Sequence, residues 1–259
     1  MRAYQVILLM LAMALSACEF KFMQGTNEPE KGAAEVLRYD RLESRYLTTG
    51  DFSALQQMNT QYPVQTRMLL EDMLQLGEVS DPSINSRFLN LYQDTVLQTI
   101  IADVGTQYAD LSDVEQSLNT SLERLRELLP NMPIPKIYVQ IGALTQSVVV
   151  GEQLVGVSLD KYLGADYPLY VRYYTPQQRK TMTRSYIVPD CLSFYLLSLY
   201  PLTVSEEHVQ TARDRHMGRI QWVVNQALGT KFFRSAYVDA AAKAMKQHPQ
   251  TVEEFLKLP

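Results

Sequence analysis

Residues 136–170 read KIYVQIGALTQSVVVGEQLVGVSLDKYLGADYPLY and form the one long β-type region of a chain that otherwise reads as helix. Apolar and polar residues alternate over 137–141, which is the period of a half-buried strand. The β-branched run 146–150 and the apolar run 154–159 predict two further strands, separated by a turn at 151–153. We therefore expect a small meander within an α+β domain that is predominantly helical.

Amphipathic periodicity on both sides of this region predicts helices. Asp51 is a plausible N-cap, and Thr251 with Glu254 has the spacing of a capping box. The leucine stripe of 114–129 predicts a core-facing helix rather than a dimer zipper, because it spans too few heptads. Helices are predicted over residues 33–48, 52–59, 63–76, 114–129, 191–199, 236–247 and 251–258.

The composition is that of an ordinary globular protein. Hydrophobic residues make up 46% and charged residues 20% of the 259-residue chain, which is enough apolar material for a sizeable core. The net charge of −4 and the absence of a basic stripe give no reason to expect nucleic-acid binding.

The N-terminus predicts a lipoprotein signal peptide over residues 1–17. Arg2 supplies the positive start, and the apolar run 6–15 is too short to span a bilayer as a helix. The string LSAC ends at Cys18, which matches a lipobox and predicts lipidation of Cys18 by palmitate-like chains. An ordinary signal peptide or an uncleaved anchor is the alternative.

The predicted lipid anchor sets the domain plan and the location. Residues 18–32 read as a tether, and 33–259 as a single domain. No acidic run follows Cys18, so we expect the domain to face the periplasm rather than the cell surface. Lipidation of Cys18 leaves Cys191 without a partner, and its apolar neighbours predict a buried side chain rather than a reactive thiol.

No catalytic, metal-binding or cofactor-binding motif stands out. None of His208, His216 and His248 lies in an H-E-x-x-H spacing, and a solvated helix face is the simpler interpretation of the first two. The chain also lacks a G-x-S-x-G elbow and a glycine-rich phosphate loop. Asp160, Asp166 and Asp190 could do acid–base work if they converge. Asp160 and Asp190 each precede a predicted helix, where N-capping is the more common role.

Several strings, taken together and in order, resemble the gliding-motility lipoprotein GldB family of Bacteroidetes. They cover roughly Arg38 to Leu199 and lie behind the lipobox. The strings are RYDRLESRYL from Arg38, FSALQQMNTQYP from Phe52, MLLEDMLQLG from Met68, YQDT from Tyr92, PIPKIYVQIG from Pro133, LVGVSLDKYLGADYPLY from Leu154 and YIVPD from Tyr186.

The resemblance implies a lipoprotein of the cell envelope that is attached to the outer membrane. Our first hypothesis is that it acts without catalysis, by binding other envelope proteins. These partners would belong to the gliding-motility and type IX secretion machinery, or to its counterpart in a non-motile relative. A weaker resemblance links the chain to zinc peptidases, in which H-E-x-x-H lies on the helix that begins here at Asp190. This helix lacks both histidines and the glutamate, which implies a pseudoenzyme on a zincin-like scaffold.

Two alternatives stay open beside the interaction protein. One is a zincin-like hydrolase with an unusual or degenerate site. The other is a peptidoglycan- or glycan-binding lipoprotein, because tyrosines crowd residues 167–174 and offer faces for stacking.

The string LDKYLG and its neighbours are the candidate binding surface. The structural alternative is that Tyr162 and Leu163 pack in the core and that Gly164 is a helix C-cap. The candidate surface residues are Asp160, Lys161, Tyr162, Gly164, Asp166, Tyr167, Tyr170, Arg172 and Asp190.

Overall fold

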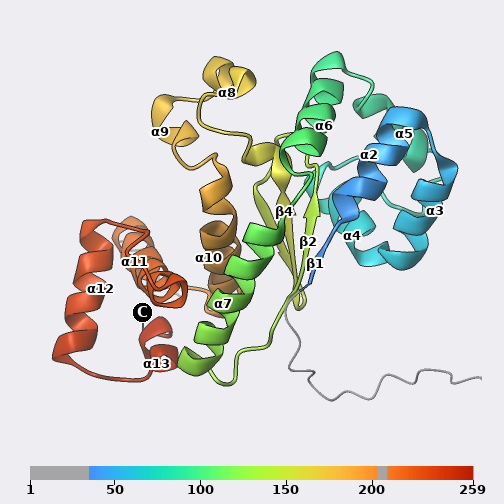
Figure 1. The fold of residues 1–259 in the computed structure, drawn as a ribbon. Coiled ribbons are helices and arrows are strands. Elements are labelled where there is room, and N and C mark those ends of the chain that lie inside the picture. The colour runs from blue at the N-terminus through green and yellow to red at the C-terminus, as the bar shows by residue number, and fades with distance from the viewer. Residues whose placement is uncertain (1–34, 203–208, 259) are drawn as a thin grey trace, which may run out of the picture. The chain divides into compact units, whose positions relative to one another are not determined.

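A four-stranded sheet with helices on both faces forms the centre of the chain in a computed structural model, which describes residues 35–202 and 209–258 (Figure 1). The described residues belong to one compact unit. The predicted α+β class with helices dominant is confirmed. Cys18, the predicted signal peptide and the predicted tether lie outside the described residues.

The sheet is mixed, with the strand order β1-β2-β4-β3. The strands are β1 (Val36–Leu37), β2 (Lys136–Gln140), β3 (Val148–Gly151) and β4 (Leu154–Ser158). β2 lies parallel to both β1 and β4, and β3 lies antiparallel to β4 at the edge. The carboxyl ends of β2 and β4 therefore meet at the same edge of the sheet.

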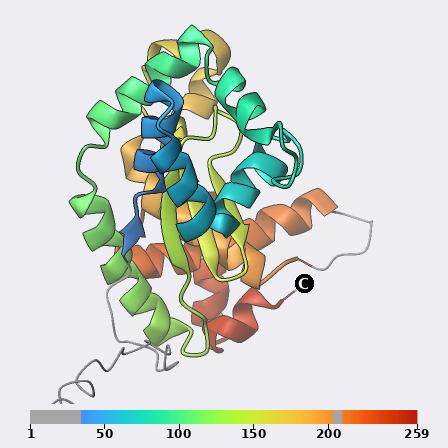
Figure 2. The same cartoon turned by 90° about the vertical axis from the view of Figure 1, so that its right-hand side faces the viewer.

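The predicted meander is wrong in its strand order. A meander would pair β2 with β3, whereas β2 pairs with β4 over its whole length. Residues 137–140 of β2 are all buried, because α2 (Tyr39–Thr49) packs on one face of the sheet and α10 (Ile187–Leu199) on the other (Figures 1 and 2). Coverage of both faces is typical of parallel strands.

The helix predicted from residue 33 begins later, at Tyr39. Val36 and Leu37 instead form β1 and pair with Ile137 and Tyr138 of β2. Val36 is buried, so its apolar side chain serves the sheet rather than a helix face. Gly50, with φ of 68°, closes α2 as predicted.

The helices before the sheet follow the predicted caps but not every predicted boundary. Asp51 caps α3 (Phe52–Gln61) by accepting the N–H of Ser53, as predicted. The segment predicted as one helix over 63–76 splits into α4 (Pro63–Arg67) and a π-helical turn, η1 (Met68–Met73).

Three further helices lead to β2: α5 (Ile84–Leu91), α6 (Thr95–Gln107) and α7 (Ser112–Leu128). The leucine stripe of α7 faces the core, as predicted, with Leu118 and Leu125 buried.

A chain of short elements returns across the carboxyl edge of the sheet before α10 begins. They are η2 (Leu159–Lys161), α8 (Pro168–Tyr173), α9 (Pro176–Arg179) and η3 (Arg184–Tyr186). Figure 1 shows α8 and α9 beyond the end of β4, near the start of α10. The segment between β4 and α10 therefore lies over the carboxyl edge of the sheet.

The C-terminal helices α11 (Val209–Leu228), α12 (Ala236–Gln247) and α13 (Val252–Leu256) pack on one another. The capping box of Thr251 and Glu254 is present, as predicted. None of the helices in the described ranges is long and apolar enough to cross a membrane.

Candidate functional site

The loop that follows β2 is held by two buried carboxylates. Asp160 accepts the N–H groups of Gly142 and Leu144 at 2.8 and 2.6 Å, and Glu43 accepts the N–H of Ile141 at 2.8 Å. Both acids are completely buried. The carboxylates thus satisfy backbone donors that leave the ladder at the end of β2.

This loop has an unusual backbone. Ala143 and Leu144 have φ values of 47° and 60°, which is the left-handed region that residues with a Cβ rarely adopt. Such strain persists only where surrounding contacts over-determine the conformation. The N–H groups of Gly142 and Leu144, one on each side of Ala143, both donate to Asp160 and supply those contacts.

Burial controls the ionisation of both acids. Desolvation raises the pKa of Glu43 well above its ordinary value, against the hydrogen bond from Ile141 that lowers it. Burial also raises the pKa of Asp160, and the N–H groups of Gly142 and Leu144 oppose that shift. These acids are internal supports of the loop rather than surface groups.

A pocket of about 230 Å³ lies where this loop meets the segment from η2 to α10. Ser147 comes from the loop, Lys161 and Tyr162 from the end of η2, and Asp190 from the first turn of α10. The lining residues are Ser147, Lys161, Tyr162, Tyr174, Gln178, Thr181, Met182 and Asp190. We call it the Lys161–Asp190 pocket.

The charged groups of this pocket are held by phenols. The hydroxyl of Tyr162 donates to Oδ2 of Asp190 at 2.9 Å. The ammonium of Lys161 donates to the carbonyl of Leu144 at 3.1 Å and to the hydroxyl of Tyr174 at 3.2 Å, and it lies 4.9 Å from the centre of the Tyr174 ring.

Burial raises the pKa of Asp190 to about 6, and the hydrogen bond from Tyr162 opposes the shift. Burial and the neighbouring Asp190 raise the pKa of Tyr162, so the phenol stays protonated as a donor. With a pKa of about 6, Asp190 is mostly ionised at neutral pH, and it lines the pocket together with the amino group of Lys161.

Only part of the predicted surface reaches solvent. Asp160, Tyr162 and Tyr170 are buried, at 0%, 1% and 0% exposure, so their placement on an exposed surface is wrong. Tyr170 donates to the backbone carbonyl of Asp160 and accepts the N–H of Leu163, which pins α8 to η2. The burial follows from the short return path of the chain, which turns these side chains inward.

The remaining predicted residues lie around this interior group. Lys161 and Asp190 line the pocket. Tyr167 is half-buried and donates to Asp103 at 2.7 Å. Among the other predicted surface residues, Asp166 and Arg172 are exposed and Gly164 is half-buried.

The capping interpretations of Asp160, Gly164 and Asp190 are wrong. α10 already begins at Ile187, so Asp190 lies inside its first turn and bonds to Tyr162. Asp160 bonds to the loop after β2, and Gly164 donates to the carbonyl of Met182 with a φ of 118° that favours glycine.

The sequence patterns did not single out Glu43, Ser147 and Gln178 as site or support residues, and Tyr174 was noted only among the tyrosines of 167–174. Glu43 shares the buried face of α2 with Tyr39, four residues earlier, and that spacing was readable. The other residues come from loops and short turns, for which no periodic signal exists.

The residues with classical catalytic or ligand chemistry are occupied elsewhere. Cys191 is buried as predicted, and burial raises the pKa of its thiol to about 12. Ser193 donates to the carbonyl of Pro189. Nε2 of His216 lies 2.8 Å from the carbonyl oxygen of Tyr200, and His208 lies outside the described residues. In residues 35–202 and 209–258, no cluster of three or more His, Cys, Asp or Glu could hold a metal ion.

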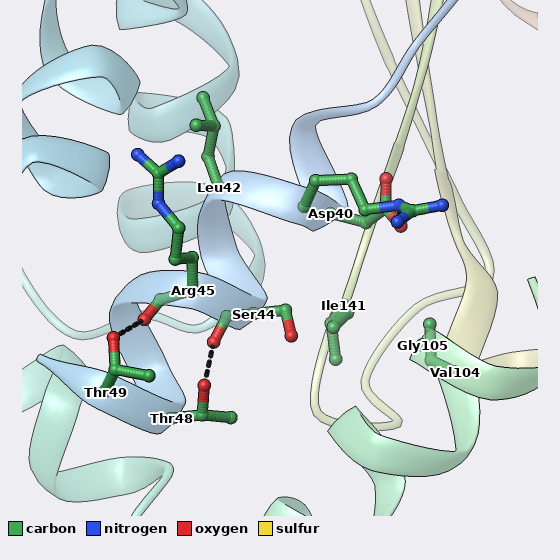
Figure 3. A pocket seen from close by; sticks show the side chains of 10 residues that line it. Asp40, Leu42, Ser44, Arg45, Thr48, Thr49, Val104, Gly105 and Ile141 are labelled. Carbon is green, nitrogen blue, oxygen red and sulfur yellow. Dashed lines mark hydrogen bonds and ion pairs between the residues drawn. The ribbon is translucent and has the colours of Figure 1, made fainter. Parts of the chain in front are cut away.

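A larger hollow of about 420 Å³ lies between α2 and α6, with Ile141 at its base (Figure 3). Several of its polar groups already have partners within the protein. Thr48 and Thr49 donate to carbonyls of their own helix, and Asp40 is bound by Arg38 at 2.6 Å. The smaller Lys161–Asp190 pocket offers more chemistry to a ligand despite its size.

Fold and site together define a mostly helical α+β protein with a charged pocket at the carboxyl edge of a small mixed sheet. A family model described as "Gliding motility protein GldB" matches residues 25–232. The chain belongs to this family, and the match extends well beyond the Arg38–Leu199 range of the sequence resemblance. No curated protein and no solved structure matches the chain.

Proposed function

We propose that this gliding-motility family member is a lipid-anchored, non-catalytic component of the cell envelope that binds another envelope protein. The partner would belong to the type IX secretion and gliding machinery, or to its counterpart in a non-motile relative. The family match supports the envelope role. One structural observation carries the binding role, namely the exposed apolar and basic face of α8.

This α8 surface consists of Asp166, Tyr167, Val171, Arg172 and Tyr173. Val171 and Tyr173 are 53% and 64% exposed and lie beside Arg172, so two apolar side chains and a guanidinium are exposed next to one another. The guanidinium of Arg172 lies 5.3 Å from the centre of the Tyr173 ring. Tyrosine and arginine are enriched at the centres of protein interfaces, where they dominate binding energy.

The surface is presented on a rigid base. Tyr170, in the same helix, is buried and bonded to the backbone of Asp160 and Leu163. The backbone of α8 is therefore held in place before a partner binds, which favours affinity.

In this proposal, Cys18 carries the lipid that attaches the protein to the membrane. The short apolar segment before Cys18 and the family label, which marks lipoproteins, support lipidation at this residue. We expect Cys18→Ser to move the protein from the membrane fraction to the soluble fraction of its own host. Retention of this variant in the outer membrane would contradict the anchor.

The test of the partner is affinity purification of the full-length protein from its host membranes. The triple variant Val171→Ala, Arg172→Ala, Tyr173→Ala removes the α8 surface without touching the buried base. Phe52→Ala is the matched control, because Phe52 on α3 is 72% exposed. We expect at least about a tenfold loss of the co-purified protein in the triple variant only. Equal recovery from both variants would contradict the assignment.

The glycan-binding alternative has less support from the same region. Stacking on a sugar needs an exposed aromatic face. Tyr170 is buried, while Tyr167 and Tyr174 are half-buried and hydrogen-bonded to Asp103 and Lys161. Tyr173 remains as an exposed ring, and Arg172 already lies over it.

A further inference from the structure

The Lys161–Asp190 pocket holds two opposite charges that do not pair with each other. Lys161 bonds to a backbone carbonyl and a phenol, and Asp190 bonds to a phenol, so all three partners are neutral groups. Within residues 35–202 and 209–258, neither forms an ion pair. Unpaired charges at partly buried positions cost folding energy. Such a cost is typical of a site that meets its counter-charges in a ligand.

The two charges are also held in place. The carbonyl that accepts from Lys161 belongs to Leu144, whose strained backbone is fixed by Asp160. Asp190 is fixed by the buried phenol of Tyr162. Supports of this kind pre-organise a binding site before the ligand arrives.

The volume limits the ligand. At about 230 Å³, the pocket is smaller than the sites that take drug-sized molecules. Hydroxyl and amide groups of Ser147, Thr181 and Gln178 complete a polar lining.

We propose that the Lys161–Asp190 pocket binds a small zwitterion of the α-amino-acid class. The ammonium group of the ligand faces Asp190, and its carboxylate faces Lys161. Both charges of the pocket are then neutralised at once, by a ligand small enough to enter. This site shares no residue with the α8 surface, and the inference does not depend on the proposed protein partner.

The test is ligand-observed NMR titration of the full-length protein in detergent micelles with L-alanine. D-alanine, measured in parallel, tests which enantiomer binds better, and dialanine tests which distance between the two charges is preferred. Acetate carries only the carboxylate of the ligand, and methylammonium carries only its ammonium group. We expect each of the two to bind at least about tenfold more weakly than the best zwitterion, because each satisfies a single charge.

Variants assign the binding to the pocket. Lys161→Met and Asp190→Asn should each raise the dissociation constant of the zwitterion about tenfold or more. Lys180→Met and Asp239→Asn are matched controls at exposed positions outside the pocket and should change nothing. Thr181→Trp fills the mouth of the pocket from an exposed position, so it blocks binding without removing a charge.

The outcomes separate clearly. Loss of zwitterion binding in the pocket variants, with both controls intact, supports the proposal. It is overturned if no zwitterion binds the wild-type protein, if acetate binds as tightly as alanine, or if the variants bind like the wild type. Should either charge variant fail to fold by circular dichroism, Thr181→Trp decides the question alone.

Discussion

At the scale of single residues, ionisation of the partly buried Asp190 lowers the stability of the folded protein. The pKa of Asp190 is 3.8 as a free side chain and about 6 in the folded protein, because burial disfavours the ionised form. The folded state therefore holds its proton more tightly than the unfolded state. This contribution to stability is fully present below pH 3.8 and is lost as the pH rises through about 6.

Replacing Asp190 by Asn should remove this pH dependence. Asn keeps an acceptor for the hydroxyl of Tyr162 and carries no charge, so Asp190→Asn should stabilise the protein at pH 7.5 by up to about 3 kcal/mol. The gain should vanish near pH 4, where the native Asp190 is protonated. Urea unfolding of both proteins at the two pH values measures this difference. A constant difference at all pH values would contradict the assignment of the pKa shift.

Asp160 should respond in the opposite direction to the same substitution. In Asp160→Asn, the side-chain NH₂ would face one of the two N–H donors from Gly142 and Leu144. One buried donor then loses its acceptor, at a cost of about 1–3 kcal/mol, in a loop that is already strained. Asp166→Asn is the control, because Asp166 is exposed, and it should leave the unfolding midpoint unchanged. Equal midpoints for both variants would show that the carboxylate does not hold the loop.

At the scale of elements, the contact between β2 and β4 depends on Gly156. Gly156 pairs with Tyr138, and a Cβ at this position would lie 2.4 Å from the phenol ring. Tyr138 is buried and cannot swing away, so Gly156→Ala should cost about 1–3 kcal/mol through overpacking.

A matched glycine in a helix provides the control for this prediction. A Cβ at Gly105 in α6 would meet no atom within 4 Å, so Gly105→Ala should be neutral or stabilise by up to about 1 kcal/mol. Thermal unfolding of the two variants compares a packed and an open glycine directly. Similar destabilisation of both would contradict the packing argument.

The same elements show what local patterns could and could not predict. The positions of β2, β3 and β4, the helix caps at Asp51 and Thr251, and the core face of α7 follow from short-range chemistry and were predicted. The order of the strands depends on which neighbours share a ladder, and alternation does not encode this. β1 was missed because two residues are too few for a periodic signal.

The candidate site was predictable only in part, for the same reason. LDKYLG and Asp190 were singled out, and the structure brings Lys161, Tyr162 and Asp190 into one pocket. Which of these side chains point inward is decided by the return of the chain from β4 to α10. That path is a long-range property, and it also supplies Tyr174 and Gln178.

At the scale of the whole molecule, the region matched by the family ends at residue 232, before α12 and α13. These two helices nevertheless pack on α11, where Trp222 meets Phe255 edge to face at 5.6 Å. Figures 1 and 2 show them beside α11 and away from α8 and α9. The C-terminal helices therefore stabilise a part of the protein that is separate from the Lys161–Asp190 pocket.

A substitution at Gly218 can test whether α12 and α13 unfold independently of the sheet, because this glycine lets α11 and α12 approach closely. A Cβ at Gly218 would lie 2.6 Å from Cβ of Tyr237 and 2.7 Å from its backbone carbonyl carbon. Backbone atoms cannot yield as a flexible side chain would, so Gly218→Ala should force the two helices apart at a cost of about 1–3 kcal/mol.

Hydrogen exchange followed by mass spectrometry locates the effect of Gly218→Ala. We expect faster exchange in α12 and α13, because local opening follows the lost packing, and unchanged exchange in β2 and β4. Ligand titrations of the pocket should match those of the wild type, since no residue of α11–α13 lines it. Faster exchange in β2 and β4 of this variant would show instead that the C-terminal helices and the sheet unfold as one cooperative unit.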